Sequence, residues 1–260
     1  MSRARRGMLA ALLVCAGAAA CTEVSTDPQF PVSLQFDSLP SAAVVVGDTM
    51  RGADLLPAAI PARAYNAAGA TLVDSLVRVI GIDTVSVKAF GIVGGLKLVG
   101  RVITPLVRVV AQAGALQSQT QTFAVVPVPT RLGRLAADSA DSVVYDAPDT
   151  VQRFVTVRAQ LAADTVLLNG LRIRFRVVSF PTTLLDSVRI VDGGAGRNVT
   201  SAITVNGSAA VRVKTYPKTG PIGTGVIRLE ASSIALGRQV PQSPLQFSVR
   251  MAQFKFPTPP

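Results

Sequence analysis

The sequence contains no histidine and no tryptophan, and its two cysteines are Cys15 and Cys21. Glutamate occurs only at positions 23 and 230, and the other acidic residues are aspartates spread along the chain. General acid–base catalysis usually recruits histidine or a carboxylate of tuned pKa, and zinc sites usually recruit cysteine or histidine. The serines likewise have no histidine that would serve as their base. The composition therefore predicts a protein that is not an enzyme and that binds no metal and no cofactor.

Aromatic residues make up only 5% of the chain, whereas apolar residues make up 49%. A core must then be built mostly from Val, Leu, Ile and Ala. The most prominent apolar run, residues 8–20 (MLAALLVCAGAAA), is too short to span a bilayer comfortably. This run must therefore have another purpose.

The first 21 residues have the order of an export signal. Arginines at positions 3, 5 and 6 precede residues 8–20, and three alanines stand directly before Cys21. A charged head, a short apolar segment and small residues are typical of a secretory signal. The cysteine at its end resembles a bacterial lipobox, which implies removal of residues 1–20 and a lipid anchor on Cys21. We expect a protein held in the cell envelope by that anchor, and Thr22 is compatible with the outer membrane.

The chain is basic, with a formal net charge of +11. Removing the three signal arginines leaves 23 basic and 15 acidic side chains, a net charge of +8. Such a charge favours anionic neighbours, although its simplest role is solubility. The basic residues are scattered and form no run of the kind that marks a nucleic-acid-binding tail, so we expect no nucleic-acid partner.

Beyond a short tether at residues 21–30, the sequence has the two-residue period of β-strands. Apolar and polar residues alternate in short runs such as 32–37 and 107–112, bounded by Gly, Pro, Asn and Asp. Residues 131–141 would form one or two turns of helix or a linker. Pro127 and Pro129 stiffen a boundary near residues 126–130. The pattern predicts two β-sandwiches and no long helix.

The first half resembles a bacterial Ig-like group 2 domain. Residues 44–49, VVVGDT, match the family's early strand and its Gly-Asp-Thr turn. Later parts of the family pattern follow in order: an alanine-rich strand and turn at 62–72, a central strand at 83–87, a glycine turn at 95–100 and a closing hairpin at 106–126. The tryptophan usual in the middle strand is absent, so Leu76 or Val79 would fill its space.

The second half resembles an Ig-like domain of the intimin and invasin type. The resemblance rests on an Asn-Gly turn before a strand, in residues 168–178 (LNGLRIRFRVV) and 205–215 (VNGSAAVRVKT), and on residues 225–232 (GVIRLEAS). Together the two resemblances imply two tandem immunoglobulin-like β-sandwiches, and the boundary places them at 31–128 and 129–255. They also imply a spacer or adhesion module without catalytic residues. The last residues, 256–260, form a tail that we expect to be disordered.

Basic residues alternate with apolar ones in two of the predicted strands. A strand would place Arg172, Arg174 and Arg176 on one face, about 7 Å apart. Arg212 and Lys214 alternate in the same way. If these strands share a sheet, the five side chains form a cationic face that suits phosphate or carboxylate groups. The alternative is a solvated face without a ligand, which also discourages edge pairing.

Two further patterns suggest sites and are better explained otherwise. Asp138, Asp141, Asp146 and Asp149 cluster near the boundary, but their spacing matches no calcium loop, which favours a polar linker. Residues 192–196 (DGGAG) lack the Gly-Lys-Ser/Thr ending of a phosphate-binding loop, so we expect a turn there.

Three functions stay open from the sequence. The leading hypothesis is a non-catalytic, membrane-anchored envelope lipoprotein that serves as an adhesion, spacer or envelope-interaction module. The second is a binding module for an acidic glycan or lipid, and the third is an accessory subunit of an envelope enzyme complex. The partners expected are therefore the membrane, an anionic glycan or lipid, or an envelope protein.

Overall fold

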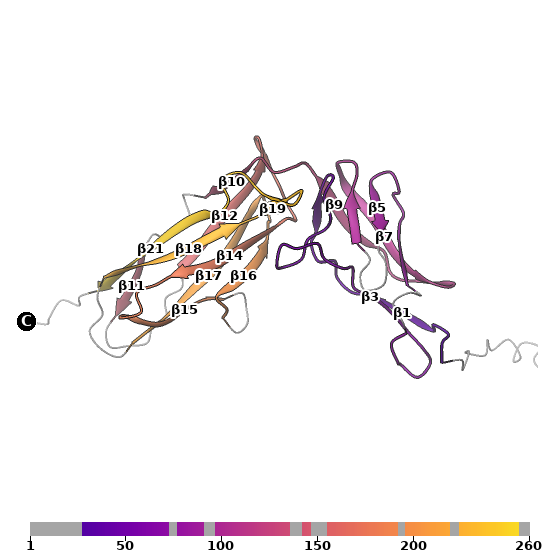
Figure 1. The fold of residues 1–260 in the computed structure, drawn as a ribbon, viewed down its shortest axis with the longest axis horizontal. Helices are drawn as coiled ribbons and strands as arrows, with labels where there is room; N and C mark the ends of the chain where they lie inside the picture. The colour runs from indigo at the N-terminus through magenta and orange to yellow at the C-terminus, as the bar shows by residue number, and fades with distance from the viewer. Residues whose placement is uncertain are drawn as a thin grey trace, which may run out of the picture.

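The protein is described here from a computed structural model that covers residues 28–72, 77–90, 97–135, 142–146, 155–191, 196–218 and 224–254. Within these ranges the chain forms β-strands and no helix, which confirms the all-β prediction. None of the described segments is therefore a helix long and apolar enough to cross a membrane. The strands form two groups, one before and one after residues 127–130, and no sheet contains strands from both (Figure 1).

The first group is a sandwich made from nine strands. They are β1 (Ser33–Phe36), β2 (Ala43–Val45), β3 (Ala62–Tyr65), β4 (Arg78–Gly81), β5 (Val87–Phe90), β6 (Lys97–Gly100), β7 (Thr104–Ala113), β8 (Leu116–Gln117) and β9 (Gln121–Val126). The main sheet has the order β2-β9-β7-β4, with β8 paired to β7. Two short sheets, β1-β3 and β5-β6, pack over it and enclose an aliphatic core that contains Val79. Leu76 lies outside the described residues.

The second group is a larger sandwich made from twelve strands. They are β10 (Arg131–Arg134), β11 (Ser142–Asp146), β12 (Val155–Ala163), β13 (Val166–Leu167), β14 (Arg172–Ser179), β15 (Leu185–Val191), β16 (Val199–Ile203), β17 (Ser208–Pro217), β18 (Gly225–Ser232), β19 (Ile234–Ala235), β20 (Arg238–Gln239) and β21 (Leu245–Phe254). One sheet has the order β10-β12-β17-β15, with β13 paired to β12, and the facing sheet has the order β11-β21-β18-β14-β16. The short hairpin β19-β20 projects from one end of this sandwich toward the first one (Figure 1).

Two local expectations were wrong. Residues 131–134 form β10 and not a helical turn, because pairing with β12 places Leu132 in the core of the second sandwich. Only Val87 of the expected strand at 83–87 is in a strand. Asp83 instead begins a turn, and its carboxylate accepts hydrogen bonds from the backbone and side chain of Arg108.

Strand β2 is buried on both faces, which explains why its residues are all apolar and do not alternate. The side chain of Val44 packs into the core of the first sandwich. Its neighbours Ala43 and Val45 pack into the core of the second sandwich, where Ala124 and Val126 of β9 also make contact. A strand sends successive side chains to opposite faces, so this one strand belongs to two cores at once. The two sandwiches are thus joined by shared packing as well as by the connecting chain.

Candidate functional site

The most elaborate polar arrangement in the described residues lies where the two sandwiches meet. From the first sandwich come β2 and the turn that follows it, residues 46–51. From the second come the segment 170–172 and the hairpin β19-β20. Leu171, Arg172 and Ile234 of these segments line a small pocket together with residues of the first sandwich. We call this region the junction.

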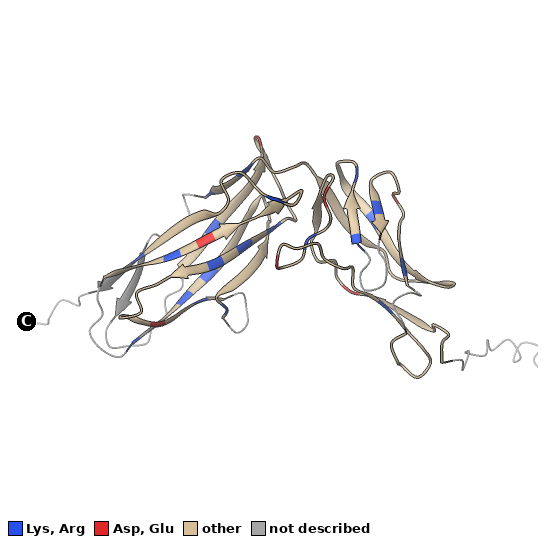
Figure 2. Ribbon diagram, in the orientation of Figure 1, with Lys and Arg blue, Asp and Glu red and all other residues tan. Residues whose placement is uncertain are grey.

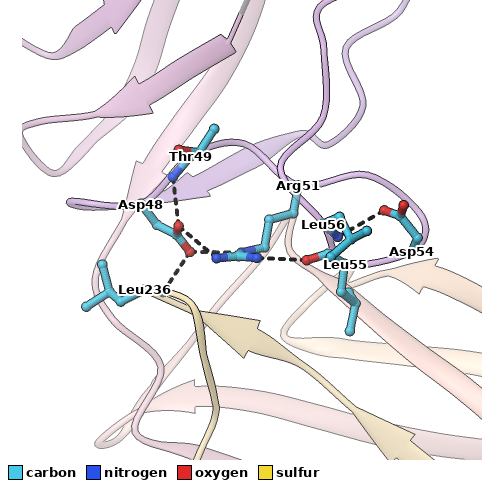
Figure 3. A network of polar contacts seen from close by, with 7 residues as sticks. All are labelled: Asp48, Thr49, Arg51, Asp54, Leu55, Leu56 and Leu236. Atoms are coloured by element: carbon cyan, nitrogen blue, oxygen red, sulfur yellow. Dashed lines mark hydrogen bonds and ion pairs between the residues drawn. The ribbon is translucent and has the colours of Figure 1, made fainter.

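Asp48 is the centre of the junction, and its side chain is only 9% exposed. One carboxylate oxygen accepts hydrogen bonds from the backbone N–H of Thr49 at 2.8 Å and from Nη2 of Arg51 at 2.9 Å. The other accepts from Nε of Arg51 at 2.9 Å and, across the junction, from the backbone N–H of Leu236 at 2.7 Å (Figure 3). Nη1 of Arg51 donates to the carbonyl of Leu55 at 2.7 Å. With so many donors engaged, the carboxylate is a structural anchor and is poorly placed for acid–base chemistry.

The backbone on both sides of this anchor has unusual geometry. Leu236 has a φ of 52° and Leu55 a φ of 66°, conformations that a leucine rarely adopts. Each contributes a backbone group to the Asp48–Arg51 network, which gives a physical reason for keeping the strained conformation. Gly47 also has positive φ, and a Cβ there would lie 3.3 Å from Cδ2 of Leu236. The Gly-Asp pair in residues 44–49 is therefore explained by contact with the other sandwich.

A second set of contacts surrounds Gly170. Its carbonyl accepts hydrogen bonds from the hydroxyl of Ser41 at 2.6 Å and from the backbone N–H of Ala43 at 3.1 Å. Gly170 has a φ of 78°, and a Cβ there would come within 2.9 Å of the backbone nitrogen of Ala43. The Asn169-Gly170 pair thus brings the second sandwich into direct backbone contact with β2.

The sequence predicted that Arg172 projects freely from the sheet. In the structure its side chain is instead part of the junction. Its Nε donates to the carbonyl of Pro40 at 2.7 Å, and Nη1 donates to the hydroxyl of Ser201 at 3.1 Å. Burial lowers the pKa of the Arg172 guanidinium, which nevertheless stays charged at neutral pH. The backbone carbonyl of Arg172 also accepts a hydrogen bond from Ser233 at 3.0 Å.

A first prediction separates Arg172 from its neighbour on the same strand. Arg172→Gln should lower the free energy of unfolding by about 1–3 kcal/mol, because the hydrogen bond from a charged donor to the partly buried Pro40 carbonyl is lost. Arg174→Gln removes the same charge two residues along β14 and should change it by less than about 1 kcal/mol. Urea unfolding of both variants measures the difference. Equal small losses would mean that Arg172 does not hold the junction.

The other predicted basic residues do not form one face. Arg174 and Arg176 lie on β14, whereas Arg212 and Lys214 lie on β17, which belongs to the facing sheet. Because the two sheets enclose a common core, their outer faces point in opposite directions and each carries its own basic residues (Figure 2). Arg176 also forms an ion pair with Glu230 at 2.7 Å. The single five-residue face expected from the sequence is therefore wrong in its geometry.

The remaining candidate residues fall partly or wholly outside the described ranges. Asp138, Asp141 and Asp149 lie outside them, and Asp146 is described only as the last residue of β11. Cys21, residues 192–195 and the tail at 256–260 also lie outside. Among the described residues, no group of three or more Asp, Glu, His or Cys side chains is placed to hold a metal ion.

The described architecture defines a tandem β-sandwich protein with a tightly packed junction. No protein-family model matches the sequence, and no curated protein matches it. Among solved structures, the chain is similar to domains 4–9 of the surface-layer protein SbsC, with a TM-score of 0.31 and 12% identity, over 86% of this chain and 32% of that one. It thus spans about a third of that structure.

Two other solved structures are similar over the same share of this chain. Domains 5–6 of the S-layer protein SbsC give a TM-score of 0.28 and 13% identity, with 86% of this chain and 100% of that one covered. The collagen adhesin (CNA) from S. aureus gives 0.23 and 8%, with 86% of this chain and 93% of that one covered. Similarities this low in score and identity carry no weight for function.

Proposed function

We propose that this protein is a non-catalytic lipoprotein of the bacterial cell envelope, anchored through Cys21, in which two β-sandwiches act as a rigid spacer or adhesion module. The observation that carries the proposal is the junction. A flexible linker would allow the sandwiches to move independently, and inter-domain motion is the default for small polar interfaces. Here a shared strand and several hydrogen bonds that join the two sandwiches oppose such motion.

The rigidity follows from the kinds of contact at the junction. Strand β2 cannot leave the second core without exposing Ala43 and Val45 to water. Separation would also leave the N–H of Leu236 and the carboxylate of Asp48 without one partner each. Buried polar groups that lose a partner are costly, so the relative orientation of the two sandwiches should be well defined.

The test of the spacer is a distance measurement between the sandwiches. The mature chain carrying Cys21→Ser receives two spin labels. One is attached at Val85→Cys, which is exposed in the first sandwich, and the other at Asp186→Cys, which is exposed in the second. Pulsed electron–electron double resonance should give one narrow distribution of distances between the two labels. Adding Asp48→Ala and Arg172→Gln should broaden it, whereas adding Arg174→Gln should not. A broad distribution without junction substitutions would contradict a rigid spacer.

The anchor is tested separately from the junction. In the full chain expressed in a Gram-negative host, Cys21→Ser should move the protein from the membrane fraction to the soluble fraction or leave the precursor unprocessed. Mass spectrometry of the wild-type protein should find a lipid on Cys21 and no residues 1–20. Mature protein that retains residues 1–20 would contradict the lipid anchor.

A further inference from the structure

The outer face of β15 and β17 carries like charges directly opposite each other. In the antiparallel pairing of these strands, Arg189 faces Lys214. Arg212 lies two residues before Lys214 on the same side of β17, about 7 Å along the strand. Like charges directly opposite across two strands destabilise a sheet. This pairing is therefore unfavourable for the sheet by itself and calls for an explanation.

Both opposed cations contact the same aromatic ring. The Nζ of Lys214 is 4.9 Å from the centroid of the Tyr216 ring, and the Cζ of Arg189 is 5.9 Å from it. Contacts of a cation with a ring face orient both partners, so the ring and the two charges form one fixed group. We call Arg189, Arg212, Lys214 and Tyr216 the basic platform.

The opposite face of the same sandwich is organised differently. There Arg176 is directly opposite Glu230 and forms an ion pair with it, and Arg172 is engaged at the junction. On the basic platform, no ion pair with a carboxylate is found in the part of the chain that the structure describes. Asp186, exposed at the start of the same strand as Arg189, likewise forms none there. The platform therefore offers cationic groups to a partner, whereas two arginines of the other face are already occupied.

We propose that the basic platform binds an acidic polysaccharide. Arginine and lysine bind carboxylate or sulfate groups, and two cations along a strand suit a polymer whose negative charges recur along its length. This site goes beyond the proposed spacer, since neither role requires the other.

A polysaccharide fits the platform better than a lipid bilayer does. Binding to a membrane surface is strengthened by apolar side chains that enter the acyl boundary. Apart from Val191, which lies opposite Arg212, the described neighbours of the platform on its own face are polar or small, such as Thr156, Gln160 and Ala210 on β12 and β17. The second sandwich also lies at the far end of the molecule from β1, the first strand after the expected anchor (Figure 1). An extended acidic polymer beyond the membrane is therefore the favoured partner.

The experiment measures binding of the mature protein, carrying Cys21→Ser, to polygalacturonate, with neutral dextran as the control polymer. Wild-type protein should bind polygalacturonate only, and binding should weaken as salt is raised from 50 to 300 mM, which is about the range over which charge screening becomes strong. Arg212→Gln with Lys214→Gln should weaken binding by about tenfold or more. The matched control, Arg174→Gln with Arg228→Gln on the other sheet, removes the same charge and should weaken it less than about twofold.

Each other outcome overturns the proposal. No binding by the wild-type protein at 50 mM salt, about the lowest working ionic strength, would remove the platform as a glycan site. Equal losses in the two double variants would mean that only net charge matters. Stronger binding to phosphatidylglycerol vesicles or to single-stranded DNA than to polygalacturonate would assign the platform to a lipid or a nucleic acid. None of these results bears on the distance measurement, so failure here is distinguishable from failure of the spacer.

A charge reversal links the binding role to the cost in stability. Lys214→Glu places a carboxylate opposite Arg189, which turns a repulsive pair into an attractive one. The variant should unfold at a higher urea concentration than the wild type and should lose binding to polygalacturonate. A variant that is less stable than the wild type would show that Lys214 serves the sheet and not a ligand.

Discussion

Replacing Phe175 with alanine should lower the free energy of unfolding by about 3–5 kcal/mol. Phe175 lies on β14 with 0% of its surface exposed, and it packs in the core of the second sandwich. The substitution removes a large apolar surface from the core and leaves a cavity that the surrounding strands fill only in part. Urea unfolding followed by far-UV circular dichroism measures the loss.

The control for Phe175 is a phenylalanine of the first sandwich that is partly outside its core. Phe90 lies at the end of β5 and is 42% exposed, so Phe90→Ala should cost much less than Phe175→Ala. If Phe175→Ala were tolerated as well as Phe90→Ala, the two faces of β14 would be assigned the wrong way round. Ile173, which is also fully buried on that strand, would then have to face solvent.

Replacing Asp48 with alanine should lower the free energy of unfolding by about 3 kcal/mol. The substitution leaves the guanidinium of Arg51, only 13% exposed, without its carboxylate, and it removes the acceptor for the N–H of Leu236. Breaking a buried ion pair from one side is costly because the remaining charge stays desolvated. We place the value at the lower end of the usual range because both side chains keep some contact with water.

A double variant distinguishes an unpaired charge from a general loss of packing. Asp48→Ala with Arg51→Met removes both charges and should recover much of the stability lost in Asp48→Ala. The distance distribution between the sandwiches should still be broad in the double variant, because the bond to Leu236 remains absent. A double variant less stable than Asp48→Ala would show that the aliphatic part of Arg51 matters more than its charge.

The exposed ion pair of the first sandwich shows why burial decides the size of these effects. A hydrogen bond from the Arg108 side chain lowers the pKa of the Asp83 carboxyl, with further hydrogen bonding from its backbone. Asp83 is therefore stabilised in its charged form, and its contribution is present at neutral pH and lost as the pH falls through that lowered pKa. Because the pair is exposed to solvent and screened, Asp83→Asn should cost far less than Asp48→Ala.

Much of the fold could be predicted because strands leave a local signal in the sequence. Alternation of apolar and polar residues identified the strand of Phe175 and the direction of its side chain, since successive residues of a strand face opposite sides. The Asn206-Gly207 pair likewise marked a tight turn, and both residues have positive φ in the structure. Such features depend on neighbours in the chain, so the sequence alone was enough to find them.

The sites depended on contacts between residues far apart in the chain. Alternation shows that Arg172 and Arg212 each leave the core, but it does not show which sheet a strand joins. The pairing of strands places Arg212 on the opposite side of the sandwich from Arg174, and it brings Arg189 next to Lys214. Sheet order is set by packing of whole strands over long separations, and no short segment records it.

The sequence by itself determined that this chain is all-β, poor in catalytic groups and built on an aliphatic core. Only the tertiary structure decided what the VVVGDT segment does. From the sequence it was an apolar strand and a turn of a single domain. In the structure, β2 divides its side chains between two cores, and Asp48 reaches a backbone N–H 188 residues away. A strand that is apolar on both faces signals burial, but the identity of the partner on each face comes only from the packed molecule.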